Sequence, residues 1–247
     1  MWLLGKLERF GYRKADVIVG TMPNLIEHVK EVEPGFKACI CIPQGLKMEQ
    51  LVTAEPLDAN YVAQQFTPET FKVVYAGTVN PNNPIEVLLK AVSQIPASQK
   101  VEAYILGSGS MLESYKQKYA FCDRIKFIEP IPKKQVKAFL QLTDLCFDSV
   151  ASELARFGLS RNKWIDYMNA GRPIVCSFSG YQSMINESQS GTFVPFGNVE
   201  LLIAEILRYK ALPVDDRLEM GRRAQKYLKE NRLFKKLSLD YQGYFDV

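Results

Sequence analysis

Hydrophobic positions along the chain form short apolar runs, each followed by a longer segment with apolar residues at helical spacing. This alternation is regular from Phe71 to the end of the chain. Strands that alternate with helices build a parallel sheet with helices on both faces. The pattern therefore predicts an α/β fold with a doubly wound, Rossmann-like parallel sheet. Strands are expected at 72–76, 101–106, 125–128, 145–147, 173–177 and 191–194, with helices between them and at about 198–210, 215–230 and 233–243.

A smaller set of elements precedes this domain. Residues 1–14 are expected to form a helix, and residues 15–21 and 38–42 two buried strands with a helix between them. Because two strands cannot bury both faces of a sheet, we interpret this part as the remnant of a second α/β domain. Its other strands would then lie on a missing segment or on a separate polypeptide. The predicted division is a remnant at 1–50, a linker at 51–70, the main domain at 71–230, and a C-terminal helix at 231–247 that crosses back toward the first unit.

The stretch 157–175 predicts a helix with an unusual start. Ser160 is a good N-cap residue, and residues 162–170 have apolar positions at helical spacing. The first turn of a helix carries partial positive charge and favours acidic residues. Here Arg161 and Lys163 occupy that turn, and no acid follows Ser160 by three residues as in a capping box.

A bound anion would explain these cations. Each misplaced cation costs ~0.3–1 kcal/mol, whereas free N–H groups, the helix dipole and the cations all favour a phosphate. Asp166 follows Lys163 by one turn, and two cations followed by a carboxylate suit a phosphate joined to a sugar that bears hydroxyls. The alternative is a solvated basic turn with a surface pair between Lys163 and Asp166, in the weaker order for such a pair.

The same stretch resembles the donor-site signature of glycosyltransferase family 4, in particular its bacterial surface-polysaccharide branch. The matching residues are Phe157-Gly158, Ser160, Asn162-Lys163, Asp166-Tyr167, Ala170-Gly171 and Pro173-Ile174-Val175. The resemblance implies the donor-binding half of a two-domain GT-B fold and retaining transfer of a hexose without a metal or cofactor. The co-substrate would be a nucleotide diphosphate sugar and the acceptor a glycan or a lipid-linked glycan. The chain as given is expected to be incomplete for catalysis.

The resemblance also implies roles for particular residues. Ser160, Asn162 and Lys163, with Arg161 second to them, would hold the diphosphate, and Asp166 would bind the ribose hydroxyls. Loops at the carboxyl ends of strands would complete the site, although each could equally be an ordinary turn. The further donor-binding candidates are Gly77, Thr78, Gly107, Gly109, Pro130 and Ile131, with Phe157 and Gly158 bordering the sugar.

Two departures from the family pattern affect the expected chemistry. Many members carry an arginine and a lysine in the loop after the first strand of this domain, whereas Gly77 to Asn83 holds no cation. Arg161 and Lys163 are expected to substitute. The family's first conserved glutamate would fall on Gly158, so Glu153 is the candidate catalytic residue and the catalytic group is otherwise unknown.

Composition narrows the function further. The net charge is +4, and no basic block interleaved with aromatic residues indicates a nucleic-acid partner. Five scattered cysteines fit a reducing cytoplasm, with Cys39 and Cys41 as buried thiols, and the lone His28 is expected to be a surface or packing residue. No apolar run reaches the ~18 residues of a membrane span. An apolar stripe near the N-terminus is more typical of a core face, while peripheral contact with the inner face of a membrane stays open. The stripe consists of Trp2, Leu3, Leu4, Leu7 and Phe10.

Two other functions remain as alternatives. The chain could be a non-catalytic nucleotide-sugar binding module that needs a separate acceptor-binding half. It could also be an unrelated doubly wound enzyme, such as a dehydrogenase or an epimerase. No third glycine follows Gly109 where a dinucleotide fingerprint needs one, and the acidic and histidine set of an epimerase is missing.

Overall fold

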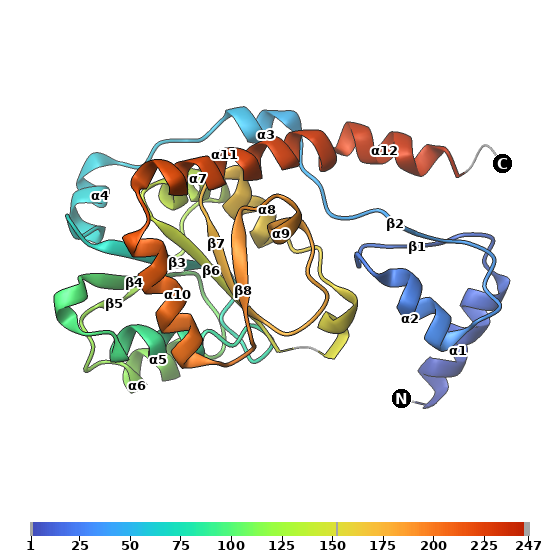
Figure 1. The fold of residues 1–247 in the computed structure, drawn as a ribbon, viewed down its shortest axis with the longest axis horizontal. Helices are drawn as coiled ribbons and strands as arrows, with labels where there is room; N and C mark the ends of the chain where they lie inside the picture. The colour runs from blue at the N-terminus through green and yellow to red at the C-terminus, as the bar shows by residue number, and fades with distance from the viewer. Residues whose placement is uncertain (1, 152, 245–247) are drawn as a thin grey trace.

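The computed structural model describes residues 2–151 and 153–244, without the side chains of residues 153 and 154. Within this part of the chain the strands form two sheets, and every pairing of strands is parallel (Figure 1). The larger sheet has the order β5-β4-β3-β6-β7-β8. The predicted doubly wound parallel sheet is therefore confirmed. Its strands are β3 (Phe71–Ala76), β4 (Val101–Leu106), β5 (Ile125–Ile128), β6 (Leu145–Val150), β7 (Ile174–Phe178) and β8 (Gly191–Val194).

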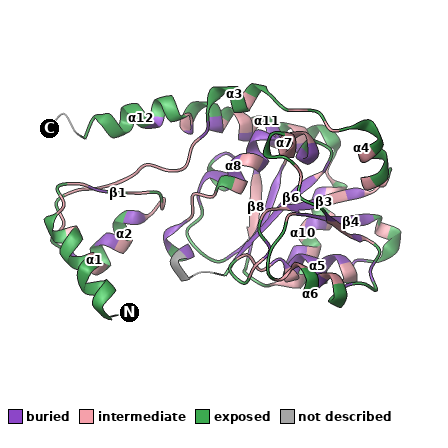
Figure 2. Cartoon of the chain, turned by 180° about the vertical axis from the view of Figure 1, so that it is seen from behind, coloured by how far each residue is buried: buried purple, intermediate pink, exposed green. Residues whose placement is uncertain are grey.

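Helices cover both faces of this sheet (Figure 1). Alternate residues of β3 serve the two faces, because Val73 and Tyr75 join one hydrophobic core and Val74 joins the other. Figure 2 shows the strands as the most deeply buried part of the chain. One face carries α5 (Glu86–Gln94), α6 (Leu112–Lys118) and α10 (Val199–Ala211). The other carries α7 (Lys133–Gln141), α8 (Asn162–Asn169), α9 (Met184–Glu187) and α11 (Val214–Asn231).

The strand order reverses between β3 and β6. These two strands pair over a short length that ends at Val74 and Cys146, so they separate toward their carboxyl ends. Tyr167 of α8 fills the gap, because its hydroxyl accepts from the Ala76 N–H at 2.9 Å and donates to the Phe147 carbonyl at 3.0 Å. Open α/β sheets bind ligands outside the carboxyl ends of the strands, at the point where the order reverses. The fold itself therefore indicates where a site should lie.

The N-terminal unit is a two-stranded sheet with two helices: α1 (Trp2–Lys14), β1 (Ile18–Gly20), α2 (Leu25–Val32) and β2 (Cys39–Cys41). Its small core centres on Ile18, Leu25 and Val29. Cys39 and Cys41 are half-buried free thiols rather than fully buried ones.

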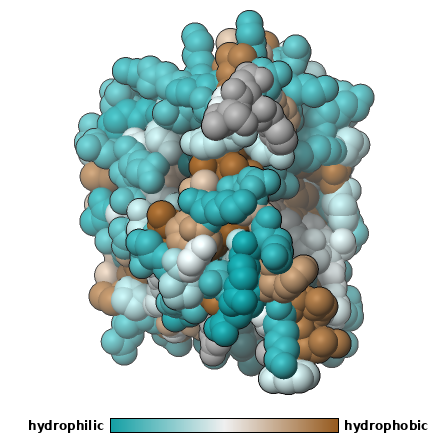
Figure 3. Space-filling model, turned by 90° about the vertical axis from the view of Figure 1, so that its right-hand side faces the viewer, coloured by the Kyte–Doolittle hydropathy of each residue, from teal (hydrophilic) through white to brown (hydrophobic). Residues whose placement is uncertain are grey.

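Helix α1 turns its apolar stripe away from the protein. Arg9 and Arg13 of this helix bond to α2 and the residue after it, through the Val32 carbonyl and the Glu33 carboxylate. The expected core face is instead more than half exposed at each of Trp2, Leu3, Leu4, Leu7 and Phe10. Brown hydrophobic atoms gather at the lower right of this end of the molecule (Figure 3). No described helix has both the length and the hydrophobicity needed to cross a membrane.

The segment between the two sheets contains helices that the sequence pattern did not predict. Part of the predicted linker folds as α4 (Ala59–Gln65), whose N-cap is Asp58, and the end of α3 (Met48–Val52) also lies there. Asp58 accepts hydrogen bonds from two backbone N–H groups of α4. After α11 the chain ends in α12 (Phe234–Gln242), which extends over the N-terminal unit (Figure 1).

The loop before α8 joins the N-terminal unit to the large sheet. It includes a short 3-10 helix, η2 (Glu153–Phe157). The Asn24 N–H donates to the Phe157 carbonyl at 2.8 Å, and the Gln44 N–H donates to the Ser160 hydroxyl at 2.7 Å. The predicted sugar-bordering and phosphate-binding residues thus lie where the two units meet.

Candidate functional site

Two glycine loops form one wall of the site at the carboxyl ends of β3 and β4. The Val79 N–H donates to the Ser108 carbonyl at 2.9 Å, so the loops touch through their backbones. Gly107 has a φ of +150°, and a Cβ on it would lie 2.0 Å from the Gly77 carbonyl oxygen. A Cβ on Gly109 would meet the Val79 carbonyl at 2.1 Å. Contact between the loops therefore explains both glycines without any ligand.

A fully buried carboxylate on β6, Asp148, organises the charges of the site. Arg161 Nε lies 2.9 Å from its Oδ2 atom, and Lys163 Nζ lies 3.0 Å from its Oδ1 atom. Trp164 Nε1 donates to Oδ2 at 2.8 Å. Two cations and one carboxylate leave an excess of positive charge at the point where the strand order reverses.

Lys163 crosses this edge of the sheet toward β3. Its Nζ atom donates to the Tyr75 hydroxyl at 2.8 Å and lies 4.0 Å from the centre of that ring. A Cβ on Gly77 would lie 3.1 Å from the Cε and Nζ atoms of Lys163, so Gly77 leaves room for the lysine. Burial lowers the pKa of Lys163, and the neighbouring charge of Asp148 acts in the opposite direction.

Arg161 reaches the loop that follows β3. Its Nη2 atom donates to Asn83 Oδ1 at 2.6 Å, and Asn83 Nδ2 donates to the Thr78 carbonyl at 3.2 Å. The structure thus brings Arg161, Lys163 and the Gly77-Thr78 loop together. This is the loop in which the two cations were expected to replace an arginine and a lysine.

The start of α8 differs from the prediction. Arg161 occupies the N-cap position without a side-chain cap, and Ser160 bonds to the Gln44 N–H instead, so the prediction that Ser160 is the N-cap is wrong. The backbone N–H groups of Asn162 and Lys163 have no partner among the residues that the structure describes. Asn162 is exposed. The first turn therefore offers free N–H groups next to two cations.

Asp166 has a separate partner. It pairs with Lys133 at the start of α7, whereas Lys163 pairs with Asp148, so the alternative of a surface pair between Lys163 and Asp166 is wrong. Burial raises the pKa of Asp166, and the ammonium group of Lys133 acts in the opposite direction. The carboxylate is thus held at the edge of the site rather than in bulk solvent.

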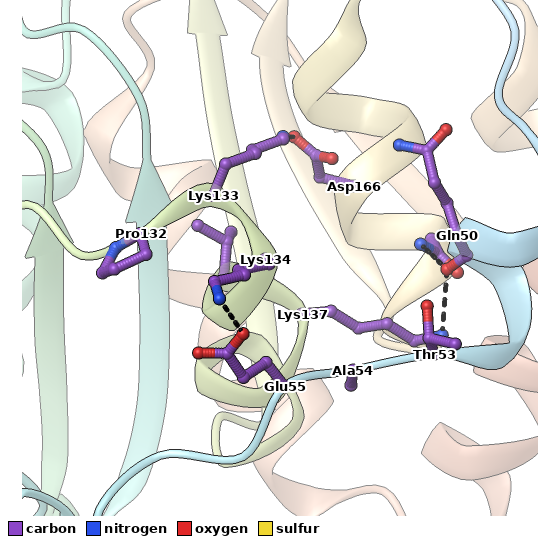
Figure 4. Close-up of a pocket in the computed structure, with 11 residues that line it drawn as sticks. Gln50, Thr53, Ala54, Glu55, Pro132, Lys133, Lys134, Lys137 and Asp166 are labelled. Carbon is purple, nitrogen blue, oxygen red and sulfur yellow. Dashed lines mark hydrogen bonds and ion pairs between the residues drawn. The ribbon is translucent and has the colours of Figure 1, made fainter.

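Asp166 and Lys133 line a cavity of about 730 Å³ between α7, α8 and the chain around α3 (Figure 4). Lys134 pairs with Glu55 on one side of it, and Lys137 donates to the Leu51 carbonyl at 2.6 Å. The predicted base-binding residues Pro130 and Ile131 lie just before α7. Pro130 is exposed, and Ile131 is partly buried against the hydrophobic core on this face of the sheet.

Phe157 and Gly158 serve the junction between the units. Phe157 is buried, and its ring centre lies 5.1 Å from that of His28. Gly158 has a φ of +83°, and a Cβ there would lie 3.0 Å from Pro23. His28 packs as expected, with its Nε2 atom 2.8 Å from Glu8. The side chain of Glu153, the candidate catalytic residue, lies outside the described ones.

Sequence reasoning missed Asp148, the residue to which the predicted cations are bound. The available signal was an acid in the middle of the apolar run Leu145–Val150, because an acid buried in a strand needs a cationic partner. It also missed Tyr75 and Lys133, whose sequence neighbourhoods look ordinary. In the described residues no three histidine, cysteine or acidic side chains group as metal ligands.

Comparison with known proteins identifies the family to which this chain belongs. A model of the family described as glycosyl transferases group 1 matches residues 70–210, more than half of the chain. No curated protein matches the sequence. The three similar solved structures that follow are at most 20% identical to this chain, so the similarity shows the fold alone.

The chain is similar to sucrose-phosphate synthase from Thermosynechococcus elongatus, with a TM-score of 0.80 and 20% identity over 100% of this chain and 61% of that one. It is also similar to HepE from Anabaena, solved in complex with UDP and glucose, with a TM-score of 0.75 and 16% identity over 98% and 66% of the two chains. A third match is WaaG, a glycosyltransferase involved in lipopolysaccharide biosynthesis, with a TM-score of 0.70 and 14% identity over 95% and 65%. The chain spans less than two thirds of each of these proteins.

Proposed function

The chain belongs to the family of group 1 glycosyl transferases, and we propose that it transfers a hexose from a nucleotide diphosphate sugar to a glycan or lipid-linked acceptor in surface-polysaccharide synthesis. One observation carries this proposal. The two positive charges of Arg161 and Lys163 outnumber the single negative charge of Asp148 at the carboxyl edge of the sheet, where this topology favours a ligand. HepE, which has a similar fold, was solved with UDP and glucose. A uridine diphosphate sugar is therefore our first choice of donor, and the cytoplasm, with contact at the inner face of the membrane, is the proposed location.

In this proposal the diphosphate lies against the start of α8. The free N–H groups of Asn162 and Lys163 and the side chains of Arg161 and Lys163 face the phosphates, next to Ser160. Negative charge grows on the diphosphate as the sugar leaves, and donors that are already in place stabilise it most strongly. Bonds from Lys163 to Tyr75 and Asp148 hold its ammonium group in place before the substrate arrives. No step in this scheme needs a metal ion.

The nucleoside would lie beside the cavity between α7 and α8. Asp166 would accept from the ribose hydroxyls, and the backbone around Pro130 and Ile131 would contact the base. Close approach of the diphosphate to the backbone would use the loops that contain Gly77, Thr78, Gly107 and Gly109. Phe157 and Gly158 would border the sugar, and Glu153 remains the candidate catalytic group.

The proposal is tested by calorimetry with UDP, GDP and ADP. The nucleotide that binds is then compared with its nucleotide diphosphate sugars. We expect one nucleotide to bind and Lys163→Ala to weaken it about tenfold or more, since a hydrogen bond to a charged group contributes ~1.5–3 kcal/mol. Lack of binding by all three nucleotides would contradict the assignment.

A second candidate is a nucleotide-sugar binding module that acts only with an acceptor-binding half. The exposed stripe of α1 favours it, because its five side chains (Trp2, Leu3, Leu4, Leu7 and Phe10) are hydrophobic and the rest of the described protein leaves them exposed. Within the described chain the sheet of β1 and β2 also has no further strands, and Val19 on it is exposed, whereas parallel sheets are usually buried on both faces. A protein surface that continues this sheet and covers the stripe would meet both needs.

A transfer assay with the chain alone separates the two candidates. Release of UDP from a UDP-sugar in the presence of acceptor glycan supports an enzyme that is complete in this chain. Binding without release, followed by release when an acceptor-binding polypeptide is added, supports the module. Replacing Leu7 and Phe10 by glutamate should then abolish release while UDP binding stays unchanged.

A further inference from the structure

We propose that Asp148 is a positioning residue that holds Arg161 and Lys163 as a preassembled pair of cations for the donor diphosphate. This inference rests on the proposed function and adds a residue to it. Asp148 would not touch the diphosphate, because it is fully buried beneath both cations. Asp148 would act by fixing the positions of the two cations.

The carboxylate of Asp148 is fixed on both of its oxygen atoms. Oδ2 accepts from Trp164 Nε1 at 2.8 Å and lies 2.9 Å from Arg161 Nε. Oδ1 accepts from Lys163 Nζ at 3.0 Å, and Arg161 Nη2 lies 3.4 Å away. Trp164 is fully buried, so it fixes the plane of the carboxylate. Both cations are thus bound to one rigid group that comes from a different element, β6.

The two cations keep donors free on the open side of the site. Lys163 uses two of its three N–H groups, on Asp148 and Tyr75, and the third has no partner in the described part of the chain. Arg161 Nη1 likewise has none within residues 2–151 and 153–244. The side chains of Arg161 and Lys163 are still 19% and 13% exposed, so a ligand can reach them.

Asp148 also favours the charged form of the lysine. The groups that face Lys163 are Tyr75 from β3, Asp148 from β6, Cys176 from β7 and Arg161 from the loop before α8. Burial and the charge of Arg161 lower the pKa of Lys163, whereas the charge and hydrogen bond of Asp148 raise it. Without the carboxylate, Lys163 would therefore lose its proton at a lower pH.

A positioning role gives Asp148→Asn an effect opposite to that expected from net charge. Removing a negative charge makes the site more positive, so charge alone predicts tighter binding of UDP. Positioning predicts weaker binding, because the two cations lose their shared partner and Lys163 becomes easier to deprotonate. The sign of the change therefore distinguishes the two explanations.

The experiment measures UDP binding by calorimetry between about pH 6 and pH 9, together with thermal unfolding. We expect Asp148→Asn to bind UDP at least about tenfold more weakly at the alkaline end, and to recover part of this affinity at the acidic end. Asp144→Asn is the matched control, because Asp144 pairs with Arg217 just before the amino end of the same strand. It should lose stability but keep the affinity and pH profile of the wild type.

Folded Asp148→Asn protein that binds UDP as tightly as the wild type, or with the same pH profile, would overturn the inference. If this variant does not fold, Asp148→Glu decides, since it keeps the charge but moves the carboxylate by one methylene. Weaker binding with a wild-type pH profile would support positioning, and wild-type affinity would overturn it. Wild-type protein that binds none of UDP, GDP and ADP would instead overturn the proposed function, and this inference with it.

Discussion

Replacing Lys163 by methionine removes the charge and keeps the length of the side chain. The change deletes the contacts with the Tyr75 hydroxyl at 2.8 Å and with Asp148 Oδ1 at 3.0 Å. Asp148 keeps Arg161 and Trp164 as partners, and Tyr75 still donates to the Thr78 carbonyl at 2.6 Å. No buried charge is left alone, so the expected loss of stability is ~1–3 kcal/mol rather than the ~3–5 kcal/mol of a fully broken buried pair.

The expected loss of affinity follows from the free N–H group of Lys163. One hydrogen bond between charged groups contributes ~1.5–3 kcal/mol. At 1.4 kcal/mol for each factor of ten, Lys163→Met should weaken UDP binding about 10- to 140-fold. Burial lowers the pKa of Lys163, so wild-type affinity should fall as pH rises, starting below the ordinary lysine value of about 10.4. The variant should lack this fall.

Calorimetry of UDP binding and urea unfolding check the two effects separately. Arg217→Met is the control, because Arg217 is also a buried cation paired with a carboxylate, at the amino end of the sheet. It should lose stability and keep its affinity. Folded Lys163→Met protein with wild-type affinity would refute the anion site at the start of α8.

Three further predictions concern the packing of the glycine loops, the contact with the nucleoside and the independence of the reaction from metal ions. Gly107→Ala should cost at least ~2 kcal/mol in urea unfolding, because its Cβ would lie 2.0 Å from the Gly77 oxygen; a cost below ~0.5 kcal/mol would contradict the packing argument. Burial raises the pKa of Asp166, so UDP affinity should fall on acidification, starting above the ordinary value of about 3.9. Asp166→Asn should bind about tenfold more weakly without this acidic fall, whereas an unchanged profile would exclude the ribose contact. A chelator should leave UDP binding and transfer unchanged, and loss of either would contradict a metal-independent reaction.

The sheet could be predicted from the sequence because its signal is local. Strands buried on both faces give continuous apolar runs, and the helices between them give helical spacing. Helix α4 could not be predicted in this way, because it spans only seven residues and depends on a cap at Asp58 and on contacts of Tyr61 and Phe66 with the distant core. Elements that depend on non-local packing lack a periodic signal.

The predicted N-cap failed for the same reason. Serine at the start of a helix usually bonds to the N–H groups of its own first turn. Ser160 bonds instead to the Gln44 N–H, in a segment far away in sequence. A local rule cannot anticipate a competing donor that only the folded chain supplies. The placement of Gly77, Gly107 and Gly109 at one edge, by contrast, follows from the rule that parallel strands end together.

The cationic start of α8 and the acid within β6 each violate a local rule when taken alone. An acid in a buried strand needs a partner, and Arg161 and Lys163 at a helix N-terminus need an anion. Folding brings them together, so both oxygen atoms of Asp148 are paired with cations. Its single negative charge, however, compensates only one of the two positive charges. One positive charge and the free N–H groups of the first turn remain without compensation from the described residues. A diphosphate supplies the missing negative charge, which is why the pairing found in the structure strengthens the argument for an anion site that the sequence alone suggested.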